Sequence, residues 1–449
     1  MNRAIPSFLR ATAAVLCLLA APLAAVAQNS LNVPYAQFGI GTSDLPYNLP
    51  SVARMGGVAF TRAGDNYINP FNPASYASIG MESFVFDMGA NLQFTTLSNR
   101  DASVSDVDGN VGYLLVGMPL TKWWKLGAGL MPYSSSDYAS VASSQGDGYG
   151  TVNNSYAGDG GTSLAFLGSA FNILQKADGT RLQAGFNVGY LTGHFNRTIT
   201  YAFRGTDTTH YLSSRRLKET RVGSVMFDLG VQYWQPLGER YTLGVGFTYK
   251  PRRTMNVDDN ALIYTYIPSD QSLLDTVFPR RGESPEFTST LKQDHTFGMG
   301  LSLERNRKWL VAADIAFAGW SGMYYEEGST YSVFGRDAFR TGPWSRYAVA
   351  FEKIGVMDAA TYWGRISWSA GLHMEQGALR LFLNGAEQVV NEWGGGIGAS
   401  LPMRRGRSLL TVSVGYSSLG NKDLMQRNCV TLGIAVSSCE RWFAKRKYN

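Results

Sequence analysis

The residue types that usually carry catalysis or bind metals are few and scattered in this sequence. None of the four histidines stands at metal-ligand spacing from another histidine or from a cysteine. They are His194, His210, His295 and His373. The sequence contains no Gly-x-Ser-x-Gly elbow and no glycine-rich phosphate loop leading into a helix. We therefore predict no catalytic residues, no metal site and no cofactor, and we interpret the histidines as lumen or loop residues.

The acidic residues and the cysteines give no stronger indication of a site. Asp147 and Asp159 stand in a glycine-rich stretch and could bind a divalent cation, although solvation in a loop is the preferred interpretation. Cys429 and Cys439 lie on one expected strand, where a rise of about 3.3 Å per residue separates them by roughly 33 Å. A disulfide between them is excluded at that distance.

An export signal precedes the rest of the chain. Arg3 and Arg10 flank the start of an apolar run over residues 11–26, and the run ends in the small residues Ala-Val-Ala. This order of basic, apolar and small residues is typical of a secretory signal peptide, with cleavage expected before Gln28. We therefore predict a signal peptide over residues 1–27.

The composition indicates how the exported chain meets a membrane. The sequence has 50 glycines and 16% charged residues, whereas an average soluble domain has roughly 25% charged residues. No stretch after residue 30 approaches the roughly 20 apolar residues of a membrane-spanning helix. Only helices and closed barrels satisfy every backbone group in lipid, so a membrane-embedded chain must form a barrel. The basic clusters at 404–407 and 445–447 are interpreted as turn and tail charges, which argues against nucleic-acid binding.

Residues 83–97 alternate in the manner of a membrane-facing strand. Their apolar row is Phe84, Phe86, Met88, Ala90, Leu92 and Phe94. In a barrel this row faces lipid, and the other row faces the lumen. We therefore expect Asp87, Asn91 and Gln93 to face the lumen. A soluble sandwich would show the same alternation with the apolar row inside, so alternation alone does not decide.

The connections between the expected strands favour a barrel, because short and long connections alternate. Short turns are expected near 120–124, 175–180, 237–240, 305–308, 355–362 and 403–407. Long polar loops are expected near 98–110, 140–160, 205–217, 252–291, 321–340, 376–392 and 417–427. The segments between them number about 14, which predicts an all-β fold, a transmembrane antiparallel β-barrel of about 14 strands over residues 83–440. We predict that residues 441–449 form a basic periplasmic C-terminal tail.

Two stretches before the first expected strand have distinctive sequences. Residues 53–58 read ARMGGV, and residues 67–76 read YINPFNPASY with an Asn-Pro-Ala run. They resemble the N-terminal hatch of the FadL family, whose members are outer-membrane channels for long-chain fatty acids and other hydrophobic compounds. The resemblance implies a 14-stranded barrel with a hatch or plug inside the lumen, here residues 28–82. The ending at 441–449 looks like the Bacteroidetes branch of the family.

The resemblance also marks individual hatch residues, which are Arg54, Gly56, Gly57, Asn69, Asn72, Pro73 and Ala74. Glycines let a backbone turn tightly and prolines stiffen it without needing donors, which suits a compact plug. The alternative is an unfolded periplasmic extension. Pro132 stands within the third expected strand, where a proline removes a ladder hydrogen bond. In the FadL family an inward kink of this strand opens the wall sideways, so Pro132 is a candidate for a lateral opening; the alternative is a simple strand end.

The leading hypothesis is a channel for uptake of hydrophobic small molecules such as long-chain fatty acids. The substrate would pass a moving hatch, with lateral exit at the third strand. The alternative is a FadL-like barrel that does not transport and is a docking or structural subunit of an outer-membrane complex. A lipase or protease is a third possibility. We expect a monomeric barrel in the cell outer membrane whose partners are a hydrophobic substrate, outer-membrane lipid and lipopolysaccharide, plus an outer-membrane protein under the docking alternative.

Overall fold

The structure is a computed structural model of the 449-residue chain. It describes residues 33, 36, 40–42, 45–81, 83–146, 150–204, 212–266, 273–277, 291–319, 339–383, 386–403, 408–423 and 425–441. The predicted signal peptide, residues 1–27, lies outside the described residues, and so do residues 442–449 of the predicted tail.

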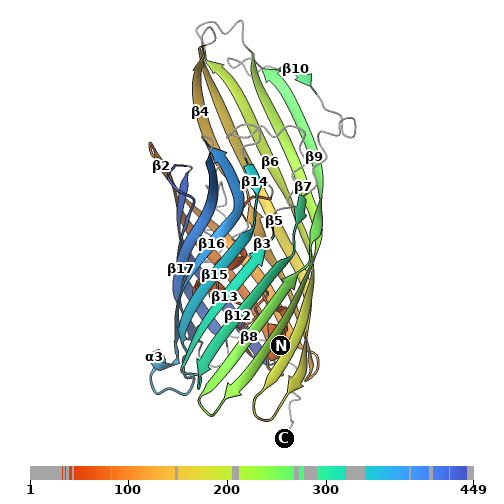
Figure 1. The fold of residues 1–449 in the computed structure, drawn as a ribbon, viewed down its shortest axis with the longest axis vertical. Coiled ribbons are helices and arrows are strands. Elements are labelled where there is room, and N and C mark those ends of the chain that lie inside the picture. Colours follow the sequence, from red (N-terminus) through yellow and green to blue (C-terminus); the bar gives the residue numbers. More distant parts are fainter. Residues whose placement is uncertain are drawn as a thin grey trace, which may run out of the picture.

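The described strands form one closed antiparallel barrel (Figure 1). The first half contains β1 (Ser83–Ser98), β2 (Ser103–Pro119), β3 (Trp124–Ser135), β4 (Tyr138–Gly146), β5 (Gly150–Gln175), β6 (Arg181–Arg204), β7 (Ser213–Leu237), β8 (Tyr241–Lys250) and β9 (Arg253–Tyr266). The second half contains β10 (Leu273–Val277), β11 (Leu291–Gln293), β12 (Thr296–Arg305), β13 (Trp309–Ala318), β14 (Phe339–Thr341), β15 (Trp344–Lys353), β16 (Ser367–Leu383), β17 (Ala386–Pro402), β18 (Leu409–Leu419) and β19 (Gln426–Arg441).

The barrel closes where β1 pairs with β19, from Ser83 opposite Arg441 to Ser98 opposite Gln426. Some consecutive strands continue one another and together count as one strand of the barrel. β3 and β4 both pair with β5, and β8 and β9 both pair with β7. Counted by position, the ring has 14 strands, which confirms the prediction. In the described part of the chain, no helix has the length and apolarity to cross a membrane.

The side chains of β1 show which row faces out. Phe94 is 40% exposed and Phe84 and Phe86 are partly exposed, whereas Asp87 is 1% exposed and Asn91 is buried. The apolar row therefore faces outward, as expected for a wall surrounded by lipid, and the polar row faces inward.

Several predicted loops are strands instead. The expected loop at 140–160 is a hairpin in which β4 pairs with the start of β5. The expected loop at 376–392 is likewise occupied by the paired ends of β16 and β17. Beyond the lipid both faces of a hairpin meet water, so its side chains lose the alternation that marks a strand while its backbone still pairs. The connection after β15 was predicted as a tight turn, but it is longer, spans 354–366 and contains α3 (Tyr362–Arg365).

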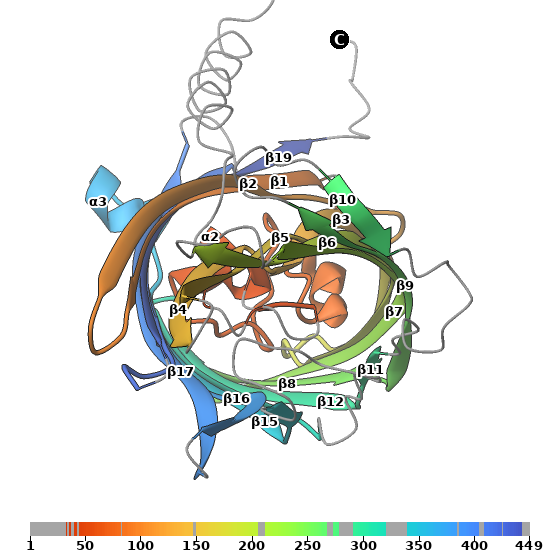
Figure 2. The ribbon, with the colours of Figure 1, turned by 90° about the horizontal axis from the view of Figure 1, so that it is seen from above.

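Residues 45–80, which precede β1, lie inside the ring of strands (Figure 2). They contain η2 (Leu45–Asn48), α2 (Pro50–Ala53) and η3 (Pro73–Ser78). α2 packs against β17, β18 and β19, whereas η3 packs against β3, β5, β6 and β7. We refer to residues 45–80 as the inner segment, and it bridges opposite sides of the barrel wall.

Candidate functional site

A buried ion triad joins the inner segment to the wall. Glu352 of β15 accepts from Arg54 Nη2 at 2.8 Å and from Arg62 Nη1 at 2.7 Å, and none of the three side chains is more than 9% exposed. Arg54 Nη1 also donates to Ser369 Oγ of β16 at 2.8 Å. Breaking a buried ion pair leaves an uncompensated charge, so these contacts hold the segment firmly against β15 and β16.

A second anchor is made by the carboxylate of Asp314 on β13. Its Oδ2 accepts from the backbone N–H of Ala59 at 2.6 Å and of Phe60 at 2.8 Å. Hydrogen bonds to an ionised acceptor are stronger than neutral ones. Asp314 is not among the residues that the sequence marked as candidates. An acidic residue at an inward position of an apolar strand was the available signal.

Asn69 and Asn72, which the sequence marked as hatch residues, hold the inner segment together through side-chain hydrogen bonds. Asn69 Nδ2 donates to Ala59 O at 2.6 Å and to Arg62 O at 2.9 Å. Asn72 Nδ2 donates to Phe60 O at 2.8 Å, and its Oδ1 accepts from Ala74 N at 3.2 Å. Asn72 is thereby the N-cap of η3, whose first residue is Pro73.

Gly56 and Gly57 adopt left-handed backbone angles, with φ of 60° and 94°. A Cβ at Gly57 would collide with the guanidinium of Arg346, and one at Gly56 would collide with the backbone of Gly371. The tight turn and the close approach to β15 and β16 therefore both require glycine.

Lys125 of β3 holds the other end of the inner segment. Its Nζ donates to Ala77 O at 2.8 Å and to Ile79 O at 2.6 Å, which satisfies carbonyls at the end of η3. The sequence reasoning did not single out Lys125, because a lysine near a turn resembles an ordinary surface charge.

The three residues predicted to face the lumen lie on β1. Asp87 accepts from Tyr113 Oη at 2.8 Å and from Ser437 Oγ at 2.7 Å, across the ladders to β2 and β19. Asn91 is 6% exposed, whereas Gln93 is only partly buried, near the point where the alternation of burial is interrupted. These two hydrogen bonds of Asp87 therefore join β1 to β2 and to β19.

The barrel wall has an interruption between β2 and β3. The two strands pair only from Leu114 opposite Leu130 to Pro119 opposite Lys125. Beyond Leu114, β2 pairs with β1 alone, and β3 and β4 pair with β5 alone, among the described strands. Pro132 lies two residues beyond the last β2–β3 pair, next to a bulge between Pro132 and Ser134. We call this interruption the wall gap.

Both sides of the wall gap are apolar. Inside lies a buried cluster that includes Leu115, Met131, Leu164, Phe166, Leu191 and Phe195. Outside lies a groove lined almost entirely by apolar atoms, which includes Leu114, Val116, Leu130, Leu167, Val188 and Tyr190. The far side of the lumen carries ion pairs between Arg346 and Glu375 and between Arg427 and Glu392. The largest buried apolar cluster of the described residues therefore lies beside the gap, and two smaller ones lie elsewhere in the lumen.

Ala36, Ile40 and Thr42 lie against the wall at the gap. Thr42 and Ser135 exchange two backbone hydrogen bonds, at 2.9 Å and 3.0 Å, in an antiparallel bridge. Ser136 Oγ donates to Ala36 O at 2.8 Å, and Ile40 joins the buried apolar cluster. The described contacts of these three residues are thus uncharged hydrogen bonds and an apolar contact, unlike the ion triad that holds the inner segment.

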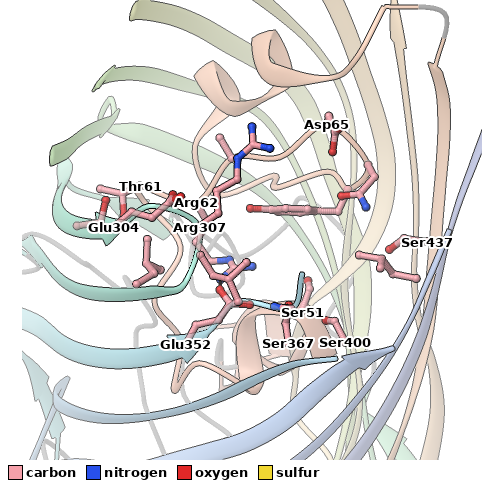
Figure 3. A pocket seen from close by; sticks show the side chains of 18 of the residues that line it. Ser51, Thr61, Arg62, Asp65, Glu304, Arg307, Glu352, Ser367, Ser400 and Ser437 are labelled. Atoms are coloured by element: carbon pink, nitrogen blue, oxygen red, sulfur yellow. Dashed lines mark hydrogen bonds and ion pairs between the residues drawn. The ribbon is translucent and has the colours of Figure 1, made fainter. Parts of the chain in front are cut away.

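A cavity of about 350 Å³, lined by polar and apolar side chains alike, lies between the inner segment and the end of the barrel that carries the short turns. Figure 3 shows its lining, with Arg62, Glu352 and Ser400 labelled. Tyr67 also lines it and lies under the guanidinium of Arg62, at 5.3 Å from the ring centroid. Burial raises the pKa of the Tyr67 phenol, so this side chain stays uncharged at neutral pH.

These features define a FadL-like outer-membrane β-barrel, which confirms the class expected from the sequence. The chain belongs to the BamG family, whose model matches residues 9–449. No curated protein sequence matches it. The assignment to the Bacteroidetes branch stays a prediction.

Solved structures show the same fold. The chain is similar to the Pseudomonas putida toluene transporter TodX, at 15% identity and a TM-score of 0.53, over 87% of this chain and 97% of that one. It is also similar to the Ralstonia pickettii toluene transporter TbuX, at 13% identity and a TM-score of 0.50, over 88% and 98% of the two chains. At these identities the likeness concerns the fold alone.

Proposed function

We propose that this barrel takes up a hydrophobic small molecule and releases it sideways, through the wall gap, into the outer membrane. The observation that carries the proposal is the interruption of the β2–β3 ladder beyond Leu114 and Leu130, with apolar side chains on both of its sides. Burying apolar surface is favourable by about 0.8 kcal/mol for each methylene, so an apolar route suits an alkyl or aromatic molecule.

A straight route to the periplasm fits less well. It would displace the inner segment, which the triad at Glu352 and the carboxylate of Asp314 hold in place. It would also pass the three buried charges of the triad, which line the cavity below and with which an apolar molecule forms no hydrogen bond. In this proposal the moving part of the hatch is therefore the backbone at residues 40–42, which is bonded to Ser135 at the gap, and the inner segment stays in place.

The substrate class we propose is long-chain fatty acids or monoaromatic hydrocarbons. TodX and TbuX are described as toluene transporters, and that agrees with an apolar lining but does not choose between the two kinds of molecule. The proposal contains no enzymatic step, and we expect the purified barrel to hydrolyse neither ester nor peptide substrates.

A disulfide across the bridge tests the route. Thr42 and Ser135 form a hydrogen-bonded antiparallel pair, whose Cα atoms are about 5.5 Å apart, a distance that suits a disulfide. In cells whose only copy carries Thr42→Cys and Ser135→Cys, with Cys429 and Cys439 replaced by serine, oxidation should abolish uptake of radiolabelled oleate and toluene. Reduction should restore it, and the Thr42→Cys single variant is the control. Uptake that is equal in the oxidised and reduced states would contradict the lateral route.

Membership of the BamG family favours a second candidate, an assembly-related role in which the barrel is a docking or structural subunit. A deletion strain distinguishes the two. Normal uptake of both hydrophobic probes with defective assembly or export of other outer-membrane proteins would favour docking. Loss of uptake with normal assembly would favour transport.

A further inference from the structure

The connection between β15 and β16, residues 354–366, is longer than the other described turns at its end of the barrel, and it exposes more large apolar side chains than the β2–β3 turn, which exposes Leu120 and Trp123. Turns such as 238–240 and 306–308 are short and polar. This connection instead exposes four large apolar side chains: Val356 at 51%, Met357 at 50%, Tyr362 at 50% and Trp363 at 69%. Exposed apolar groups gathered in one place indicate an interaction surface.

The backbone that carries these exposed side chains is held by hydrogen bonds. Val356 N donates to Gly364 O at 2.9 Å, and Arg365 Nε donates to Ala359 O at 2.9 Å. Gly355 N donates to Ser367 Oγ at 2.9 Å, which ties the connection to the start of β16. The backbone thus holds the apolar side chains outward although folding them inward would bury them.

The position of the connection indicates what covers it. Figure 2 shows α3 outside the ring of strands, beside the wall and away from the lumen. Trp363 stacks on Trp368, with ring centroids 6.4 Å apart and an interplanar angle of 9°. Trp368 begins the outward row of β16, which continues through Leu372 and Met374, 66% and 59% exposed. The exposed side chains are therefore continuous with the lipid-facing wall.

The charges around this end of the barrel agree with a phospholipid surface. The exposed cations on the described turns are Lys122, Lys176, Arg240, Arg307, Lys308 and Arg365. The exposed acids on the same turns are Asp178, Glu239 and Asp358. The excess of positive charge complements lipid phosphates, and indole rings favour the boundary between headgroups and acyl chains.

We propose that residues 354–366 form a membrane anchor that inserts Trp363 and Tyr362 into the phospholipid leaflet on the side of the short turns, the periplasmic side in outer-membrane barrels. The anchor fixes the depth and tilt of the barrel beside β15 and β16, the strands that hold the ion triad. The inference goes beyond the proposed transport and holds equally for a docking subunit.

Site-specific fluorescence tests the anchor. The full barrel with Thr361→Cys, and with Cys429 and Cys439 replaced by serine, is labelled with an environment-sensitive dye and placed in phospholipid nanodiscs. Asp178→Cys, on a polar turn of the same end, is the matched control. We expect blue-shifted emission at 361 and about threefold stronger quenching by headgroup-proximal doxyl lipid than at 178, since an interfacial anchor sits at headgroup depth.

Two outcomes would overturn the anchor. One is water-like emission at 361 with quenching no stronger than at 178. The other is emission at 361 that shifts only when a soluble periplasmic fraction is added, which would assign the surface to a protein. Trp363→Ser in the labelled protein gives an independent check, because it should return the emission at 361 toward that of water without unfolding the barrel.

Discussion

Glu352 is the residue on which the position of the inner segment depends most. It compensates two buried guanidinium groups, Arg54 and Arg62. Replacing it by alanine should leave both charges unpaired and cost about 3–5 kcal/mol, the usual effect of breaking a buried pair. Hydrogen exchange of residues 50–62 in the folded barrel should rise strongly, and urea should unfold the variant earlier. Glu239→Ala, on an exposed turn, is the control, and equal behaviour of the two variants would contradict the role of the triad.

The sequence revealed residues of the inner segment that form this site, but not their partners on the barrel wall. The Asn-Pro-Ala run and Arg54 were found because they follow each other in a recognisable stretch. Their partners Glu352, Asp314 and Lys125 lie on strands far away in the sequence, and only the register of a closed barrel brings them together. A single acidic residue on an alternating strand does not reveal that it accepts a hydrogen bond from a segment about 300 residues earlier.

At the scale of the strand, the outward row predicts a large difference between two exposed apolar positions. Ile315 on β13 is 47% exposed within the wall, and Val141 on β4 is 68% exposed on the part of the sheet that rises beyond the neighbouring strands (Figure 1). Arginine at 315 should cost about 2–4 kcal/mol, the range at the bilayer midplane, and arginine at 141 about 0–1. Unfolding of the barrel from phospholipid vesicles in urea measures both, and equal costs would contradict the placement of the lipid band.

Pro132 also acts at the scale of the strand, because it changes the backbone pairing of β3. A proline has no N–H for the ladder, and here it adjoins the bulge at the wall gap. Pro132→Val should let β3 pair more regularly and narrow the gap, so uptake of oleate should fall while the amount of folded barrel in the membrane stays the same. Pro119→Val, at the opposite end of β2, is the control. Unchanged uptake in Pro132→Val would leave Pro132 as no more than a local irregularity.

The alternation of apolar and polar residues predicts some strands of the barrel and misses others. It identified the strands in lipid correctly, because only there do the two faces meet different surroundings. It missed the upper hairpins, such as β4 with β5, whose faces both meet water. It could not reveal the wall gap, because alternation reports which face is buried and carries no information on whether a strand pairs with its neighbour.

At the scale of the whole molecule, the largest buried apolar cluster of the described residues lies on one side of the lumen, along β2, β3, β5, β6 and β7, and we call this side the apolar half. The buried ion pairs of β15, β16, β17 and β19 lie on the other side, the polar half, which also holds two smaller apolar clusters. The inner segment spans the two, with η3 against the first and α2 against the second, and Ile68 and Tyr76 belong to the apolar cluster. A molecule that reaches the gap along the apolar half does not have to break the ion triad.

This arrangement predicts that fixing the inner segment to the wall leaves transport intact. Ser78 of η3 and Gln183 of β6 already touch, with 3.0 Å between Oγ and Oε1, so cysteines at both positions can be joined by a short bismaleimide. Uptake of oleate by the crosslinked barrel should equal that of the uncrosslinked one, whereas the bridge between Thr42 and Ser135 should stop it when oxidised. If the crosslink at Ser78 abolishes uptake, the substrate moves past the inner segment, and the polar half of the lumen must be part of its route.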